Sequence, residues 1–297
     1  MNTESVVKGS SITKQFKDFK LDIPSLDIPK GFATALIGEN GAGKSTLINI
    51  LAGIRLDYNG DISYFDGNMK EEDIRENIGY TGPGNYFMPH WTINQVGEAS
   101  KLLFDRFDED EYKRLLAELD VKQPEGKKRK DKAISKLSDG MRMKVTLSAV
   151  FARQTQLLLL DEPASPLDPL MRDKLCSMIR SYIEEGDGEN SVLFSTHNIA
   201  DMENVTDYAM IMEHGQIVEQ GFVEDLKEKY ILVKGEKEDA AKAGTILYSM
   251  QTSSYGFEGI CLAESLDQLA GMDITTETPT LSQISVAVMK NFTRLSA

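Results

Sequence analysis

The central loop of this sequence reads Gly38-Glu39-Asn40-Gly41-Ala42-Gly43-Lys44-Ser45-Thr46 and fits the pattern G-x-x-x-x-G-K-[ST]. The apolar run Phe32–Ile37 precedes it and a helical pattern over Leu47–Ile54 follows it, so it is expected to join a strand to a helix. Its glycines allow backbone N–H groups to point inward at the positive end of that helix, where they can hold phosphate oxygens. In such a loop Lys44 contacts the β- and γ-phosphates and Ser45 binds Mg²⁺. The sequence therefore predicts a site for a nucleotide with Mg²⁺.

Two more apolar runs, Leu157–Leu160 and Val192–Phe194, predict further buried strands. Buried strands that alternate with helices indicate right-handed crossovers and a parallel sheet, with ligands at the carboxyl ends of the strands. Alternating apolar and polar residues over Ser11–Lys30, with Pro24 and Pro29 as breaks, add short antiparallel strands. The predicted fold is an α/β phosphate-loop NTPase core with a mostly parallel sheet and an antiparallel β edge. The helical patterns lie at Leu47–Ile54, Glu109–Leu119, Gly140–Arg153 and Leu170–Tyr182.

Two adjacent carboxylates, Asp161 and Glu162, follow the run Leu157–Leu160. Side chains alternate along a strand, so the two groups need not share one role. After a phosphate loop, Asp161 is expected to hold Mg²⁺ directly or through water, and Glu162 to polarise the water that attacks the γ-phosphate. This pair extends the prediction from nucleotide binding to hydrolysis.

Between these motifs lies the pentad Leu137-Ser138-Asp139-Gly140-Met141 at the start of a predicted helix. Ser138 can cap that helix, and Gly140 allows a close approach of the backbone to an anion. With the three motifs in this order, the chain resembles the ATP-binding subunit of an ABC transporter. The family usually has glycine at the third place and glutamine at the fifth, so two residues depart from its pattern. Met141 followed by Arg142 resembles the exporter branch that includes lantibiotic-immunity, bacitracin-type and toxin-peptide transporters. The alternative interpretation of the pentad is a bare helix cap.

The resemblance implies that two chains build each active site jointly. Ser138 and Gly140 would then meet the γ-phosphate held by the other subunit. Asp168, in a segment similar to the family's D-loop, would signal across the dimer, although Pro166 replaces the commoner glycine. His197 follows the third buried strand and matches the histidine that contacts the γ-phosphate in the family.

The resemblance also implies that ATP is the nucleotide and that its adenine stacks on Phe16, with Phe19 as the rival and strand packing as the alternative for both. Lys44, Glu162 and His197 are then the catalytic residues, and Ser45 and Asp161 the Mg²⁺ ligands. The remaining residues implied to bind ATP are Gly38, Glu39, Asn40, Gly41, Ala42, Gly43, Ser45 and Thr46, with Ser138, Gly140 and Asp168 in trans.

The weakest match is the family's Q-loop, because the position of its glutamine falls on Pro83. A proline side chain cannot bind Mg²⁺ or orient water, so coupling to a partner is expected through Asn85 or backbone carbonyls. An aromatic and methionine cluster follows, which is either core under a loop or part of a groove for a partner's cytoplasmic helix. Its members are Tyr86, Phe87, Met88, Pro89 and Trp91.

The composition is that of a soluble globular protein, with 297 residues of which 41% are apolar. There are 33 basic and 47 acidic residues, a net charge of −14, which argues against binding to nucleic acid. The basic cluster Lys127–Lys130 is accordingly expected to be a solvated loop, and Cys176 and Cys261 fit no metal-binding spacing. The first thirty residues do not read as a signal peptide, and no apolar stretch approaches the length of about 20 residues that spans a bilayer.

A change of pattern near residue 230 divides the chain. Residues 1–230 are expected to form the ATP-binding domain, with a helical subdomain at about 90–150, and residues 231–297 a C-terminal α+β accessory domain. The elements expected there are a strand at Ile231–Val233, a helix within Glu236–Ala243 and a helix after Pro279.

These features predict an ATPase that works at the cytoplasmic face of the cell membrane. ATP would close two such chains, identical or paralogous, head to tail, and hydrolysis would release them. The motion would drive a separate transmembrane permease subunit that exports a substrate. A soluble ABC ATPase acting as a mechanical or regulatory module is the alternative, while a phosphotransferase would leave Ser138–Gly140 and His197 without a role.

Overall fold

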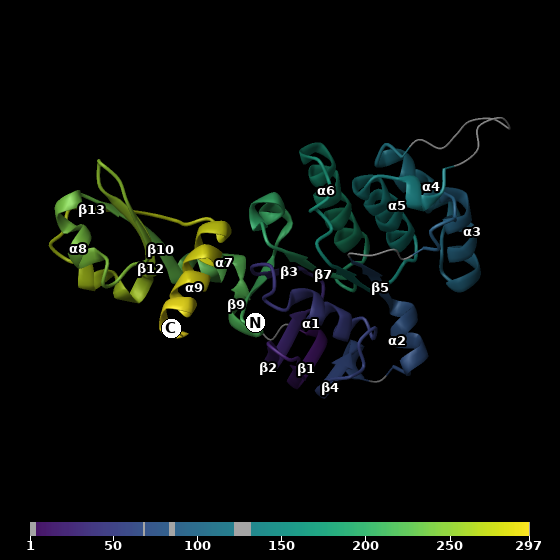
Figure 1. The fold of residues 1–297 in the computed structure, drawn as a ribbon, viewed down its shortest axis with the longest axis horizontal. Helices are drawn as coiled ribbons and strands as arrows, with labels where there is room; N and C mark the ends of the chain where they lie inside the picture. Colours follow the sequence, from purple (N-terminus) through teal and green to yellow (C-terminus); the bar gives the residue numbers. More distant parts are fainter. Residues whose placement is uncertain (1–3, 68, 83–86, 122–131, 297) are drawn as a thin grey trace.

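The computed structural model describes residues 4–67, 69–82, 87–121 and 132–296 (Figure 1). Pro83, Asn85, Tyr86 and the cluster Lys127–Lys130 lie outside the described residues. The interpretations placed on them stay predictions.

A six-stranded sheet forms the centre of the molecule, in the strand order β5-β6-β7-β3-β8-β9. The first five strands of this order are parallel, whereas β9 runs antiparallel to β8. The predicted α/β class is confirmed. Because β3, β6 and β7 are parallel neighbours, their carboxyl ends meet at one edge of the sheet. The strands are β3 (Ala33–Ile37), β5 (Ile78–Thr81), β6 (Leu157–Leu160), β7 (Ser191–Thr196), β8 (Tyr208–Glu213) and β9 (Gln216–Phe222).

A second, antiparallel sheet lies on the far side of α1 (Lys44–Leu51) from the central sheet (Figure 1). Its order is β2-β1-β4, so β2 is an edge strand. The prediction that Pro24 interrupts a strand is wrong, because Pro24 lies inside β2. An edge strand tolerates a residue without an N–H group. The strands are β1 (Ser5–Gln15), β2 (Lys20–Pro29) and β4 (Asn59–Tyr64).

Helices α5 and α6 pack on the opposite face of the central sheet, and α3 and α4 pack against α5 (Figure 1). Helices α4, α5 and α6 follow predicted helical patterns, whereas α3 is expected only as part of the helical subdomain at about 90–150. One apolar cluster joins all four helices to the sheet. The helices are α3 (Ile93–Leu103), α4 (Glu109–Glu118), α5 (Asp139–Phe151) and α6 (Pro169–Glu185), with α2 (Glu71–Asn77) and α7 (Val223–Lys229) elsewhere. Short 3-10 helices are η1 (Phe65–Gly67), η2 (Ile134–Lys136), η3 (Ile199–Asp201), η4 (Glu203–Val205), η5 (Lys237–Asp239) and η6 (Ala263–Leu269).

The C-terminal residues form a third sheet in the order β11-β12-β10-β13, with antiparallel neighbours. The predicted strand at Ile231–Val233 lies inside β10. The helix expected within Glu236–Ala243 is reduced to η5 and α8 (Ala240–Ala243). The strands are β10 (Tyr230–Gly235), β11 (Tyr248–Thr252), β12 (Phe257–Leu262) and β13 (Ile274–Glu277).

The last helix, α9 (Leu281–Ser296), packs between the C-terminal sheet and the central sheet (Figure 1). Its buried residues Ile284 and Val288 belong to the same apolar cluster as Ala209 and Ile211 of β8. Residues on both sides of position 230 therefore share one core, and the division into two domains stays a prediction.

Glu203 anchors the start of α9 to η4. Its carboxylate accepts the N–H groups of Leu281 at 2.9 Å and Ser282 at 3.4 Å. A negative charge at a helix N-terminus also interacts favourably with the helix dipole.

We expect Glu203→Ala to lower the free energy of unfolding by about 1 kcal/mol, because two N–H groups at the start of α9 lose their acceptor. Urea unfolding followed by circular dichroism measures the change. Glu224→Ala is the control, since it removes a carboxylate whose side chain is 87% exposed. An unfolding midpoint equal to that of the control would contradict the anchoring role.

Candidate active site

The phosphate loop joins β3 to α1, as its sequence predicts. Gly41 and Gly43 have positive φ angles of 90° and 111°, which favour glycine. Gly38 is required for a different reason: a Cβ there would lie 2.3 Å from the carbonyl oxygen of Met212. The Gly215 N–H also donates to the Ala42 carbonyl at 2.9 Å. The end of β8 and the following turn therefore support the loop from behind.

Lys44 is almost completely buried at the start of α1, with 5% of its surface exposed. Its ammonium donates to the carbonyls of Gly38 at 2.8 Å and Glu39 at 3.1 Å, and lies 3.5 Å from Glu162 Oε1. Burying an ammonium without partners is costly, so these oxygens stabilise it. The arrangement fixes a positive charge inside the loop.

A cavity of about 740 Å³ opens in front of this loop. It is lined by Asn40, Gly41, Gly43, Lys44, Ser45 and Thr46 of the loop and by Glu162. Ala42, in contrast, is buried in the apolar cluster below α1. Glu39 is exposed, and its carbonyl oxygen faces Lys44.

Phe16 and Phe19 also line this cavity. Their ring centroids are 5.8 Å apart and the rings are tilted by 43°. Phe19 lies close to the loop itself, because a Cβ on Gly43 would be 2.8 Å from Phe19 Cζ. Both rings therefore border the cavity, and the assignment of the base to Phe16 stays a prediction.

Asp161 and Glu162 have different environments, although they are adjacent. Asp161 is 1% exposed, and its Oδ1 accepts the hydroxyl of Ser195 at 2.5 Å. Its Oδ2 is buried without a hydrogen-bond partner in the described part of the chain. Glu162 has a positive φ of 51°, and its N–H donates to Ser195 Oγ at 2.9 Å. Ser195 thus orients both residues, a role that sequence reasoning missed.

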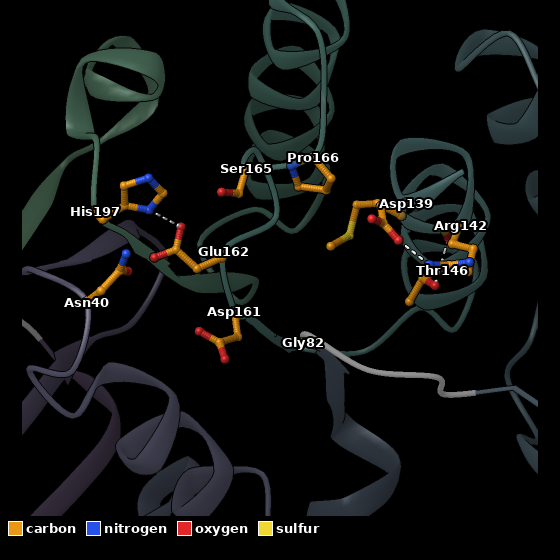
Figure 2. Close-up of a pocket in the computed structure, with 11 residues that line it drawn as sticks. Asn40, Gly82, Asp139, Arg142, Thr146, Asp161, Glu162, Ser165, Pro166 and His197 are labelled. Atoms are coloured by element: carbon orange, nitrogen blue, oxygen red, sulfur yellow. Dashed lines mark hydrogen bonds and ion pairs between the residues drawn. The ribbon is translucent and has the colours of Figure 1, made fainter. Parts of the chain in front are cut away.

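His197 follows β7 and faces Glu162. Its Nδ1 lies 2.8 Å from Glu162 Oε2, a hydrogen-bonding distance (Figure 2). Glu162 therefore lies between His197 on one side and Lys44 on the other. The structure brings these three predicted catalytic residues together.

A second cavity, of about 640 Å³, lies between the first turns of α5 and the carboxylates of Asp161 and Glu162. Asp139 and Arg142 of α5 line it together with Asp161, Glu162 and His197 (Figure 2). Asn40 and Glu162 line both cavities, so the two are adjacent.

The residues predicted to act in trans have local roles within this chain. Ser138 is exposed and caps α5 by accepting the Met141 N–H at 3.3 Å. Gly140 packs against its own D-loop, because a Cβ there would lie 2.7 Å from the Pro166 carbonyl oxygen. Asp168 caps α6 by accepting the Met171 N–H at 3.1 Å. Their contacts with another chain stay predictions.

Glu213, at the end of β8, is a second residue that sequence reasoning missed. It is 6% exposed, its Oε2 has no partner among the described residues, and burial raises its pKa. The charges of Glu39 and Lys44 act on it. His214 Nε2 lies 3.5 Å from Glu213 Oε1, and the ring centroid of His214 lies 6.3 Å from that of Phe292 of α9.

The described members of the aromatic and methionine cluster differ in burial. Phe87 and Trp91 pack against the large apolar cluster, which favours the reading as core. Met88, however, is 56% exposed.

The donors at the site fit Mg²⁺, which prefers oxygen ligands and keeps several waters. The partnerless Oδ2 of Asp161 and the hydroxyl of Ser45 are such donors. In the described residues no cluster of three His, Cys, Asp or Glu side chains suits a metal ion. A site built from few protein ligands and substrate phosphates is consistent with this finding. None of the described helices is long and apolar enough to cross a membrane.

Residues 21–165 match the family described as ABC transporter. Over 211 residues the chain is 32% identical to human "ATP-binding cassette sub-family A member 10", covering 69% of this chain and 13% of that protein. It is 33% identical over 222 residues to "Sulfate/thiosulfate import ATP-binding protein CysA" of Synechocystis, covering 74% of this chain and 61% of the relative. The chain thus spans only part of the length of these relatives.

A solved dimeric bacterial ABC transporter cassette has the same fold, with a TM-score of 0.60 and 18% identity. The match covers 73% of this chain and 98% of that structure. The same cassette is also known in a post-hydrolysis state bound to ADP and Pi. Residues 21–165 are therefore similar to the ATP-binding domain of ABC transporters, and the chain has the fold of an ABC ATPase cassette.

Proposed function

We propose that this chain binds Mg²⁺–ATP in the cavity in front of its phosphate loop and hydrolyses it to power a membrane transporter. The observation that carries the proposal is the position of Glu162. Its carboxylate lies 2.8 Å from His197 and 3.5 Å from Lys44, at the carboxyl ends of three parallel strands. Hydrolysis of a γ-phosphate needs a general base, a buried cation and a further polar contact to the phosphate, and Glu162, Lys44 and His197 can supply these three.

Each side chain has a separate task in this proposal. The loop N–H groups and Lys44 bind the β- and γ-phosphates, and Phe16 stacks on the adenine. Glu162 orients water and accepts its proton, while His197 holds Glu162 and contacts the γ-phosphate. Ser45 and Asp161 would hold Mg²⁺, which neutralises phosphate charge when it is bound.

A second chain completes the site. Ser138 is exposed at the start of α5, and neither of the two cavities includes it in its lining. A helix N-terminus that is free of its own chain's loop can bind the phosphate held by a partner. The related cassette is dimeric, which supports the same assembly, with Ser138, Gly140 and Asp168 acting in trans.

The transporter itself is proposed to include a separate transmembrane permease subunit, which holds this chain at the cytoplasmic face of the membrane. The resemblance around Met141 and Arg142 favours export. Import is the second candidate, because the Synechocystis relative is an import protein by name. Purification from the native membrane, with identification of the co-eluting integral subunit, tests the partnership. Uptake against extrusion in vesicles decides the direction.

Lys44→Ala should abolish ATP binding or lower turnover by about 100-fold or more, because the buried cation that contacts the phosphates is lost. Equilibrium binding of ATP and release of inorganic phosphate measure both effects. Lys101→Ala is the control, since its side chain is 62% exposed and pairs with Glu109 on the surface. Hydrolysis at the wild-type rate in Lys44→Ala would refute the assigned loop.

Glu162→Gln should retain ATP and accumulate as a dimer, because the amide cannot accept the proton of the attacking water. Sizing chromatography with light scattering should show a doubled mass with ATP and not without it. The double variant Lys44→Ala/Glu162→Gln should remain monomeric and serves as control. A Glu162→Gln chain that binds ATP but stays monomeric would count against the joint site.

A further inference from the structure

The ring of Phe16 is held in place by groups outside the cavity that it borders. Its backbone N–H donates to the Phe19 carbonyl at 2.8 Å, which closes the turn after β1. Gln15 Nε2 donates to the Phe16 carbonyl at 2.6 Å. The turn is therefore fixed, while the two side-chain torsions of Phe16 need further contacts.

Two cations supply those contacts. The guanidinium carbon of Arg55 lies 5.3 Å from the centroid of the Phe16 ring, and Lys14 Nζ lies 5.5 Å from it. Both distances are within the range of cation–π attraction. These cations come from different elements, since Lys14 belongs to β1 and Arg55 follows α1.

Asp57 joins the two cations to each other. Its carboxylate accepts a hydrogen bond from Lys14 at 2.5 Å and one from Arg55 at 3.2 Å. The hydrogen bond from Lys14 lowers the pKa of Asp57. Asp57 thereby offsets the repulsion that two neighbouring cations would otherwise experience.

Arg55 is also tied to the helix that carries the phosphate loop. Its backbone N–H donates to the Asn49 carbonyl of α1 at 3.0 Å. The N-terminus of α1 is the loop end at Lys44. The Phe16 ring and the phosphate loop are thus connected through Arg55 as well as through the cavity they share.

We propose that Arg55, held by Asp57 together with Lys14, is a positioning residue that fixes the Phe16 ring as the platform for the nucleotide base. This inference rests on the proposed function, because it assumes that ATP occupies the cavity with its base on Phe16. A ring that is already oriented loses less rotational freedom when the base stacks on it. Arg55 does not line the cavity, so its effect on ATP passes through Phe16.

The test compares ATP with inorganic tripolyphosphate, which has the phosphates and no base. We expect Arg55→Ala to raise the Kd for ATP about two- to fivefold, the range of one exposed cation–π contact, and to leave the Kd for tripolyphosphate unchanged. Calorimetric titrations with Mg²⁺ measure both constants. An unchanged Kd for ATP, or an equal rise for both ligands, would overturn the inference while leaving the ATPase assignment intact. Failure of the wild-type chain to bind either ligand would instead overturn the proposed function, and this inference with it.

Three further variants make the test specific to Phe16. Arg55→Lys keeps a cation near Asp57 and should recover most of the ATP affinity. Arg75→Ala, which removes an arginine from the surface ion pair with Glu71, should leave both constants unchanged. In the background of Phe16→Ala, the Arg55→Ala substitution should have no further effect on ATP binding. Additive losses from Phe16→Ala and Arg55→Ala would show that Arg55 does not act through the ring, and would contradict the proposal.

Discussion

A buried ammonium group organises the candidate site. Lys44, at the start of α1, is held by the carbonyls of its own loop and by Glu162, which follows β6. A cation in this position requires oxygen partners, because its burial would otherwise be very unfavourable. The loop can curl around it only with glycine at position 38, since the Met212 carbonyl occupies the space of a Cβ. The phosphate loop, the end of β8 and the proposed catalytic carboxylate of Glu162 therefore pack as one unit.

At the same edge of the sheet, the neighbouring carboxylates of Asp161 and Glu162 have different environments. The hydroxyl of Ser195 contacts both residues, because it donates a hydrogen bond to Asp161 Oδ1 and accepts one from the N–H of Glu162. Asp161 Oδ2 is buried without a partner in the described part of the chain and is proposed to bind Mg²⁺, whereas Glu162 lies between Lys44 and His197. The exposed helix start at Ser138 has no equivalent role in its own chain, where Gly140 instead packs on Pro166. One chain thus presents a phosphate loop and, across the adjacent cavity, the start of α5 with Ser138 exposed.

Much of this arrangement could be predicted from the sequence, because its signals are local. A buried strand, a glycine-rich turn and a helix are contiguous around Lys44, and the apolar run before Asp161 marks a second strand of the same sheet. The hydrogen bonds of Ser195 and the burial of Glu213 could not be predicted, since they depend on which strands are neighbours and on what each side chain meets. The prediction for Pro24 is wrong for a related reason. A proline is tolerated in a strand that lies at the edge of a sheet, and only the strand order shows that β2 is such a strand.

The central claim is that two chains build each ATP site jointly, and complementation between two inactive chains tests it most directly. One chain carries Lys44→Ala and the other Ser138→Arg, and each is assayed alone and in an equimolar mixture after subunit exchange. In a head-to-tail dimer, the mixed species has one site with an intact loop from one chain and an intact helix start from the other. The account predicts that the mixture regains ATPase activity, up to about one quarter of the wild-type rate. A mixture as inactive as its two components would contradict it.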